Sequence, residues 1–554
     1  MSTNNIKKLP SEKYEVTQPD YNTLDCEPIK NQKHYDVIII GGGLSGLSAA
    51  WQLKSNSVLL LDERNKLGGN ARLEYRDGLR YASAGSCFQN PIEGGEVASL
   101  LHELGLWQQW QAADQESLVL FDTKRLLKGM GEVCMALINQ PKALLIPGMY
   151  KLTFDLIKGA IMNKPFIVSP KKLGDPVFAK LFKYLEQFKP GSGKYPAVPW
   201  TEECDWSRQE MEIFDSISLH DLFFDPTVKG RLPADLQPNE ELGELVKDAI
   251  ETTLRVECLS IKDVSAYVGL HFLLGYLFGT LVTFPGGNGF LSENLKTKLS
   301  EQPSCNCQPN AKVIAVEEIG SGYEVVYMQD EMLFKVTAST VIWAAPKYVA
   351  QQVLSNIPNS QRQAISEIEH RDYCIANIFL KKAVLKSHFG GYVIEGASIN
   401  KKPYSWCRSG VCLVANWKDK SFDKDIGVLT LLKPVFGEKD QGKLKEASFD
   451  KLQQSTYQEA VLMLNAVGVA PELIEDIKIW RWNKGLVVPK VGQLKNDVFI
   501  KASMPINGLF FANQDTNGLG NLESAVSAGF KAAEQAKKWL ETQQPEDIAS
   551  AASA

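Results

Sequence analysis

The chain has 554 residues, enough for roughly two or three domains with a large buried core. Its formal net charge of −5 argues against nucleic acid as a general partner, and the sequence has no nucleic-acid-binding motif or solenoid-length repeat. The ten cysteines are irregularly spaced without a C-x-x-C pair, and the six histidines are scattered. We therefore expect free thiols in a reducing compartment, a cytoplasmic location and no metal site.

The termini and two apolar segments bear on targeting and membranes. Residues 1–34 are polar and predict a flexible arm rather than a secretory signal, and 541–554 predict a disordered tail. Residues 264–284 carry no formal charge, but glycines, serine and histidine interrupt them, so a buried helix is favoured over a transmembrane span. Residues 143–166 predict a helix of the substrate domain, with peripheral membrane contact as the alternative.

A glycine-rich turn follows the apolar run at 35–40 and is the most informative motif of the chain. Gly41, Gly43 and Gly46 form a G-x-G-x-x-G pattern that predicts the phosphate cradle of a dinucleotide fold. Leu44 and Ser45 lie at the start of the following helix, where free N–H groups bind phosphate. The alternative is a structural glycine turn without a ligand.

A second apolar run at 58–61 ends in Asp62, about 20 residues beyond the first glycine. A carboxylate at this distance accepts hydrogen bonds from an adenosine ribose. The spacing therefore favours a bound dinucleotide over a turn without a ligand.

The segment from Asp62 to Ala71 resembles the sequence E-A-R-x-x-x-G-G-R that follows the second strand in flavin-containing amine oxidases and their relatives. The resemblance implies that the bound dinucleotide is FAD. Asn70 replaces the usual arginine, so one expected cation near the flavin is missing. The residues to which this segment assigns FAD contacts are Asp62, Glu63, Arg64, Gly68, Gly69 and Asn70.

Further segments resemble the same superfamily in the same order along the chain. They are the P-x-G-G loop at 284–290, the strands at 313–318 and 341–346, the last strand at 508–516 and the helix start at 520–529. The resemblance implies that Val313 contacts adenine, and that Asp515 contacts the diphosphate or ribityl region. It also implies that backbone N–H groups around Asn521 and Leu522 face the N1–C2=O edge of the flavin, where a helix N-terminus stabilises negative charge.

The sequence itself predicts an α/β enzyme, and the resemblance implies a discontinuous Rossmann-like FAD-binding domain with a substrate domain of a mixed sheet plus helices. The FAD-binding domain is expected at 35–90, 284–346 and 480–540, and the substrate domain at 91–283 and 347–479.

Candidate catalytic residues are those that the motifs place beside the isoalloxazine ring, namely Cys87, Trp480, Trp482 and Lys484. The alternative for the last three is ordinary core tryptophans and a solvated lysine. Many amine oxidases carry a lysine that holds water near flavin N5, but the best alignment places Ala376 or Asn377 there. The sequence has no cysteine after Cys412, so the resemblance implies non-covalent FAD.

The leading interpretation is an FAD-dependent oxidoreductase of the amine oxidase superfamily. It would transfer a hydride from a C–H bond of an amine, or of an apolar or amphipathic small molecule, to flavin N5, with O2 or a quinone as electron acceptor. One alternative is an isoprenoid or lipid desaturase or isomerase with the same FAD domain. The other is a non-catalytic binding protein of the GDP-dissociation-inhibitor type.

Overall fold

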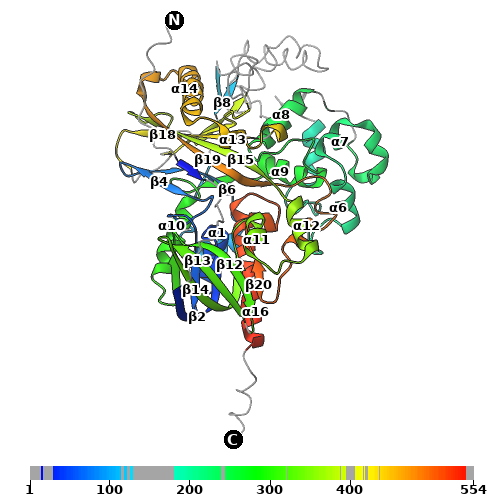
Figure 1. Cartoon of the computed structure of the whole chain (residues 1–554). Coiled ribbons are helices and arrows are strands. Elements are labelled where there is room, and N and C mark those ends of the chain that lie inside the picture. Colours follow the sequence, from blue (N-terminus) through cyan, green and yellow to red (C-terminus); the bar gives the residue numbers. More distant parts are fainter. Residues whose placement is uncertain are drawn as a thin grey trace, which may run out of the picture.

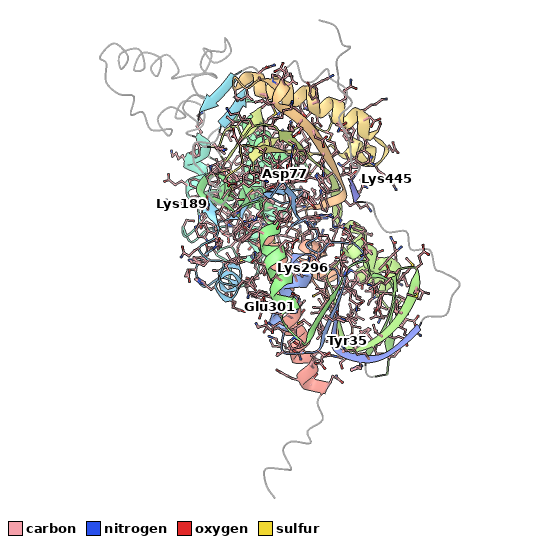
Figure 2. All side chains as sticks on the ribbon, turned by 90° about the vertical axis from the view of Figure 1, so that its left-hand side faces the viewer. Tyr35, Asp77, Lys189, Lys296, Glu301 and Lys445 are labelled. Carbon is pink, nitrogen blue, oxygen red and sulfur yellow. The ribbon has the colours of Figure 1, made fainter. Side chains whose placement is uncertain are left out.

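The computed structural model has two stacked units, with helix α16 along the lower one (Figure 1). Tyr35 lies in the lower unit and Lys445 in the upper unit in the view turned by 90° (Figure 2). No helix among the described residues is long and apolar enough to cross a membrane. The helix expected at 143–166 lies outside them. The structure describes residues 14–16, 29–113, 118–121, 125–128, 180–238, 242, 244–320, 322–386, 389–394, 406–415, 417, 422–435 and 437–543.

The lower unit is built on a seven-stranded sheet whose central strands are parallel. Apolar runs such as the four-residue run Val58–Leu61 are buried on both faces, as a parallel sheet requires. The strand expected at 313–318 lies in β12, which pairs with β13 in an antiparallel hairpin. The strands are β2 (Ile29–Ile40), β3 (Val58–Leu61), β11 (Cys305–Gln308), β12 (Lys312–Ile319), β13 (Gly322–Gln329), β14 (Met332–Trp343) and β20 (Leu509–Phe511).

Helices cover both faces of this sheet. One face packs against α1 (Leu44–Gln52), α2 (Glu96–Glu103), α10 (Gly289–Ser300) and α16 (Leu522–Gln543). On the other face, residues of the sheet, including those of β12 and β13, share a core with α11 (Lys347–Val353), α12 (Asn359–Glu367) and α15 (Val498–Ala502). The carboxyl ends of the parallel strands, and the N-termini of α1 and α16, therefore point toward the upper unit (Figure 1).

The upper unit contains an eight-stranded mixed sheet that packs against α13 (Lys443–Glu446) and α14 (Phe449–Ala466). Its long strands β15 and β19 pair antiparallel and run down toward the lower unit (Figure 1). The strands are β1 (Tyr14–Val16), β8 (Leu118–Phe121), β9 (Arg125–Lys128), β15 (Glu369–Leu380), β16 (Gly390–Ile394), β17 (Val411–Val414), β18 (Gly427–Pro434) and β19 (Ile474–Val488).

A helical block completes the upper unit beside this sheet. Its core is formed by α6 (Arg208–Asp215), α7 (Leu219–Phe224), α8 (Glu244–Arg255) and α9 (Ala266–Phe278). Ser218 and Asp221 form a capping box at the start of α7. Two small sheets lie between the units. One is the hairpin of β4 (Leu73–Arg76) and β5 (Leu79–Ala82), which contacts α10 and β18, and the other is formed by β6 (Phe88–Gln89), β7 (Gln111–Ala112) and β10 (Leu281–Thr283), which follows α9.

The expected α/β fold is confirmed, but its boundaries differ from the expected ones. The arm expected at 1–34 contributes β1, which pairs with β19, and the first residues of β2. The boundary expected at 480 falls inside β19, which pairs with β15 along its length. Helices α11 and α12 were expected in the substrate domain. They pack instead on the seven-stranded sheet of the lower unit, called the cofactor sheet below, because their apolar residues join its core. The eight-stranded sheet of the upper unit is called the substrate sheet.

Residues 91–283 contribute two strands to the eight-stranded sheet, because β8 pairs with β16 and β9 pairs with β8. The uncharged segment at 264–284 forms the buried helix α9, which spans 13 residues, followed by β10.

Candidate active site

A cavity of about 390 Å³ lies between the two units and is continuous from one to the other. Its lower part is lined by loops that follow the parallel strands of the cofactor sheet. Its upper part is lined by the substrate sheet and the helical block, from Ala113, Val256, Glu257, Tyr276, Leu281, Tyr373, Ile375, Phe389, Val411, Leu413, Leu432 and Trp482.

The glycine turn forms the floor of the lower part. Gly41 has a φ of +109°, and a Cβ there would lie 2.7 Å from the backbone nitrogen of Ala345. Gly43 caps α1 with a φ of −72°, and a Cβ there would meet only the Cα of Gly69, at 3.8 Å. The space beside Gly43 is thus cavity, which a diphosphate can enter to reach the N-terminus of α1.

Asp62 lines this cavity at the end of β3 and is held rigidly. Its Oδ2 accepts a hydrogen bond from the N–H of Gly42 at 2.6 Å, and its Oδ1 accepts one from the N–H of Arg64 at 2.8 Å. Burial raises the pKa of Asp62. Arg64 and Lys312 line the same part, so it presents cations to an anionic group.

The other predicted cofactor residues converge on this cavity. Asn70 donates a hydrogen bond to the carbonyl of Gly485 at 2.5 Å and so joins the second glycine loop to strand β19. The lining includes the predicted residues Gly41, Gly43, Leu44, Ser45, Asp62, Glu63, Arg64, Gly68, Gly69, Asn70, Val313, Asn521 and Leu522. Gly46 lies beneath the cavity and does not line it. A Cβ on Gly46 would be 1.9 Å from the carbonyl oxygen of Gly41, so a side chain cannot fit there.

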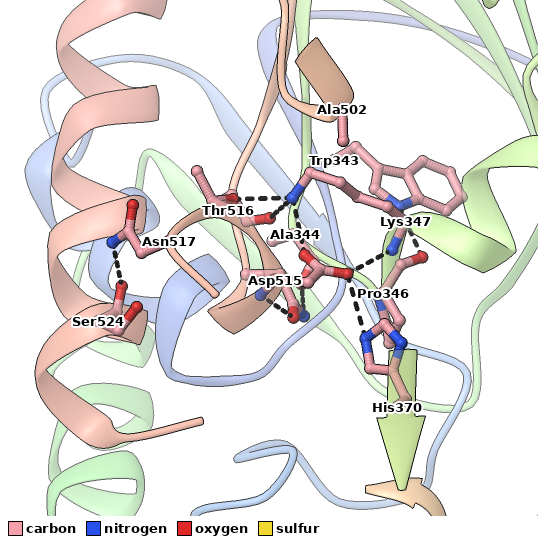
Figure 3. Close-up of polar contacts among 12 residues, drawn as sticks. Trp343, Ala344, Pro346, Lys347, His370, Ala502, Asp515, Thr516, Asn517 and Ser524 are labelled. Carbon is pink, nitrogen blue, oxygen red and sulfur yellow. Dashed lines mark hydrogen bonds and ion pairs between the residues drawn. The ribbon is translucent and has the colours of Figure 1, made fainter. Parts of the chain in front are cut away.

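Asp515 does not line the cavity, contrary to the position expected for it. Its Oδ1 lies 2.7 Å from Nζ of Lys347, and its Oδ2 accepts a hydrogen bond from the N–H of Lys347 and lies 3.5 Å from Nε2 of His370 (Figure 3). Burial alone would raise the pKa of Asp515, but Lys347 and His370 outweigh burial and lower this pKa to about 2. The neighbouring residues Asn513 and Gln514 line the cavity instead.

The predicted catalytic residues separate into two groups. Cys87, Trp482 and Lys484 line the cavity, whereas Trp480 packs behind it and donates a hydrogen bond to Oδ1 of Asn377 at 2.7 Å. Burial, with Glu257 and Glu523 nearby, raises the pKa of Cys87 to about 12, so its thiol stays protonated at neutral pH. The side chain of Lys484 lies over the ring of Tyr348, with Nζ 4.5 Å from the ring centroid.

Asn377, one of the two residues that the sequence alignment places at the position of the family's lysine, is fully buried and does not line the cavity. Its amide donates hydrogen bonds to the carbonyl of Ala82 and to Oγ1 of Thr430, both at 2.9 Å, while its oxygen accepts from Trp480. The amide thus holds β15, β18 and β19 together.

Sequence analysis missed Gln514, Glu257, Tyr276 and Tyr373. The sequence did indicate the region of Gln514, because the motif at the last strand predicted a cofactor contact for its neighbour Asp515. The others come from the end of α8, from α9 and from β15, and only tertiary packing brings them together. Among the described residues, no group of three or more His, Cys, Asp or Glu side chains could hold a metal ion.

The fold and cavity define a class of FAD-binding oxidoreductases, and comparison with known proteins identifies the family. The profile of the family described as "Flavin containing amine oxidoreductase" matches residues 44–537. The chain belongs to this family and is an FAD-dependent oxidoreductase. It is 44% identical over 534 residues to "Oxidoreductase PigB" of Serratia sp. (strain ATCC 39006), covering 96% of this chain and 79% of the relative.

Solved structures share the fold at low sequence identity. Wild-type putrescine oxidase bound to putrescine matches with a TM-score of 0.57 and 16% identity, over 92% of this chain and 100% of that chain. A fatty acid isomerase that produces CLA, from P. acnes, matches with a TM-score of 0.57 and 14% identity, over 90% and 98%. The predicted family and enzyme class are confirmed, and the non-catalytic alternative is not supported.

We predict that Gly43→Val abolishes FAD binding and leaves the protein folded. The backbone at Gly43 is extended, so valine fits it, but the side chain would occupy the cavity where the diphosphate enters. Flavin absorbance of the purified variant measures FAD binding, and its circular dichroism spectrum shows whether the protein is folded. Gly230→Val, at an exposed glycine where a Cβ meets nothing within 4 Å, is the control. Full flavin content in folded Gly43→Val would contradict the prediction.

We predict that Asp515→Asn destabilises the protein by about 3–5 kcal/mol, because Lys347 is left as an uncompensated buried charge. The pKa of Asp515 is lowered from 3.8 to about 2, so its contribution is present above pH 4 and is lost as the pH falls toward 2. Urea denaturation with saturating FAD measures both effects. The double variant Asp515→Leu/Lys347→Met should recover most of the loss. A single variant as stable as wild type would contradict this prediction.

Proposed function

We propose that the protein binds FAD non-covalently in the lower part of the cavity and oxidises a C–H bond of an apolar or amphipathic amine in the upper part. The bound flavin would supply a two-electron acceptor for the hydride. The observation that carries the proposal is the continuity of the cavity from the glycine cradle to the apolar residues of the substrate sheet.

The upper part fits an extended apolar group. Its sheet side is formed by aliphatic and aromatic side chains, so each methylene group buried there contributes about 0.8 kcal/mol of binding free energy. Trp482 is fixed by a hydrogen bond from its indole N–H to the carbonyl of Ser83 at 2.9 Å. A rigid apolar wall of this kind orients the substrate against the flavin at a low entropy cost.

A second candidate function is desaturation or isomerisation of a lipid. It is favoured by the same apolar lining and by Asn377, which is neutral and fully engaged by its neighbours. The shared fold with the fatty acid isomerase is compatible with this candidate but carries no evidence for its substrate.

We predict that acid precipitation releases the flavin into the supernatant. Among the described cysteines, Cys87 lines the cavity, and its high pKa disfavours the thiolate that a covalent link would require. Absorbance of pellet and supernatant near the flavin band is the measurement, with Cys87→Ser as the matched control. Flavin that stays in the wild-type pellet but leaves the Cys87→Ser pellet would show a link to this cysteine and overturn the proposal of non-covalent binding.

We predict slow flavin reduction by benzylamine and faster reduction as the alkyl chain lengthens from butylamine to octylamine. Longer chains bury more apolar surface, whereas Asn377 cannot supply the charge of the family's lysine. Anaerobic stopped-flow bleaching of the flavin measures the rates. Rapid bleaching by benzylamine without a chain-length effect would contradict the prediction. Bleaching by an unsaturated fatty acid but by no amine would favour the second candidate.

A further inference from the structure

An acidic group is enclosed in the upper part of the cavity, and neither the fold nor the cofactor accounts for it. Glu257 lies in the turn after α8, and Tyr276 on α9 donates a hydrogen bond to its Oε1. Both side chains line the cavity. Glu257 keeps some accessible surface because it faces the cavity, but protein surrounds it closely enough that desolvation raises its pKa.

The position of Glu257 is fixed by its neighbours. The hydroxyl of Tyr373, on β15, donates a hydrogen bond to the carbonyl of Val256 at 2.9 Å. This bond ties the turn after α8 to the substrate sheet. The N–H of Glu257 itself bonds the carbonyl of Leu254 at 3.0 Å and closes the turn. The carboxyl group is therefore held in place before any substrate enters, as a binding or catalytic group requires.

Arg371 opposes the rise in the pKa of Cys258, but the described groups that interact with Glu257 itself are weak acids. They are Tyr276 from α9, Glu523 from α16, Tyr373 from β15, Cys87 after β5 and Cys258 next to it in the chain. Burial raises the pKa of Glu523 to about 7, and Glu257 contributes to this rise. The surroundings thus raise the free-energy cost of ionising Glu257, and a cation placed in the cavity would lower that cost.

We propose that Glu257, held by Tyr276, binds the basic nitrogen of the substrate and takes up its proton before oxidation. This inference rests on the proposed oxidation of an amine. In the step, an N–H bond of the substrate ammonium breaks and an O–H bond forms on the carboxylate, which becomes neutral. The nitrogen regains its lone pair, which stabilises the adjacent carbon as its hydrogen leaves with both electrons for the flavin.

The chemistry of the site suits this step. A desolvated carboxylate is a stronger base than an exposed one, so its basicity lies closer to that of an amine. The hydrogen bond from Tyr276 favours the ionised carboxylate and so limits how far its pKa rises. Glu257 is thereby poised to pair with a cation and then accept its proton.

Binding of an unreactive cation tests the proposal without turnover. Isothermal titration of the holoenzyme with hexyltrimethylammonium and with 1-hexanol, in two buffers of different ionisation enthalpy, gives affinities and proton release. For wild type we expect tighter cation binding with proton release, because the cation stabilises ionised Glu257. Glu257→Gln should weaken cation binding about tenfold or more and abolish the release, while 1-hexanol affinity stays unchanged.

Two further variants sharpen the test. Tyr276→Phe should shift the pH midpoint of cation binding upward, since the ionised carboxylate loses a hydrogen bond, and higher pH should restore affinity. Glu301→Gln, at an exposed surface carboxylate, should behave as wild type. Unchanged cation affinity in Glu257→Gln, or equal loss for both probes, would overturn the inference. Failure of every amine to reduce the flavin would overturn the proposed function but leave the binding result intact.

Discussion

The close contact between α1 and α16 is the constraint on which the cofactor end of the molecule depends. A Cβ on Gly529 of α16 would lie 2.3 Å from the carbonyl oxygen of Ser45 in α1, and a Cβ on Gly46 would lie 1.9 Å from the carbonyl oxygen of Gly41, in the turn that leads into α1. Only glycine permits these approaches. They bring the N-termini of both helices to the same cavity, where their partial positive charges add. Helix α1 has no acidic side chain in its first turn, so an external anion can complement its dipole.

A buried ion pair between Lys347 and Asp515 connects α11 to the segment that follows β20 at the cofactor end of the molecule. Lys347 at the start of α11 bonds Asp515, Thr516 and the carbonyl of Ala512, all beyond β20 (Figure 3). A buried ion pair of this kind contributes little more to stability than apolar residues of the same shape would. It does fix the position of α11 relative to β20, the last strand. This placement leaves Asn513 and Gln514 facing the cavity.

Glycine spacing and strand periodicity predicted the dinucleotide-binding turn because its contacts are local to a strand-to-helix turn, whereas the discontinuous extent of the cofactor domain followed from the resemblance to the family. The glycine turn, the hairpin after Val313 and the buried strands needed no tertiary information. The direction in which a side chain points was harder to predict where the regular alternation of a strand or helix ends. Asp515 lies in a short 3-10 turn after β20, so neither strand nor helix alternation indicates whether it or Gln514 faces the ligand.

The upper part of the cavity was less predictable for a different reason. Trp480 and Trp482 alternate onto the same face of β19, as the sequence indicates, and both pack with Ala84 and Ile375. Which of them meets the cavity depends on Asn377, which covers Trp480. Glu257 and Tyr276 are 19 residues apart and lie among helices without a recognisable motif, so only the packing of α8 against α9 reveals the pair.

The distribution of charge along the cavity explains how one site can accept two different molecules. Arg64, Lys312 and two helix N-termini make the lower part favourable for the negative charge of a diphosphate. The upper part has the opposite character, because Glu257 and its acidic neighbours favour a cation. Under the proposed function, a nitrogen-bearing substrate and the cofactor would be drawn to opposite ends of the cavity, and the apolar walls between them would exclude water from the place where they meet.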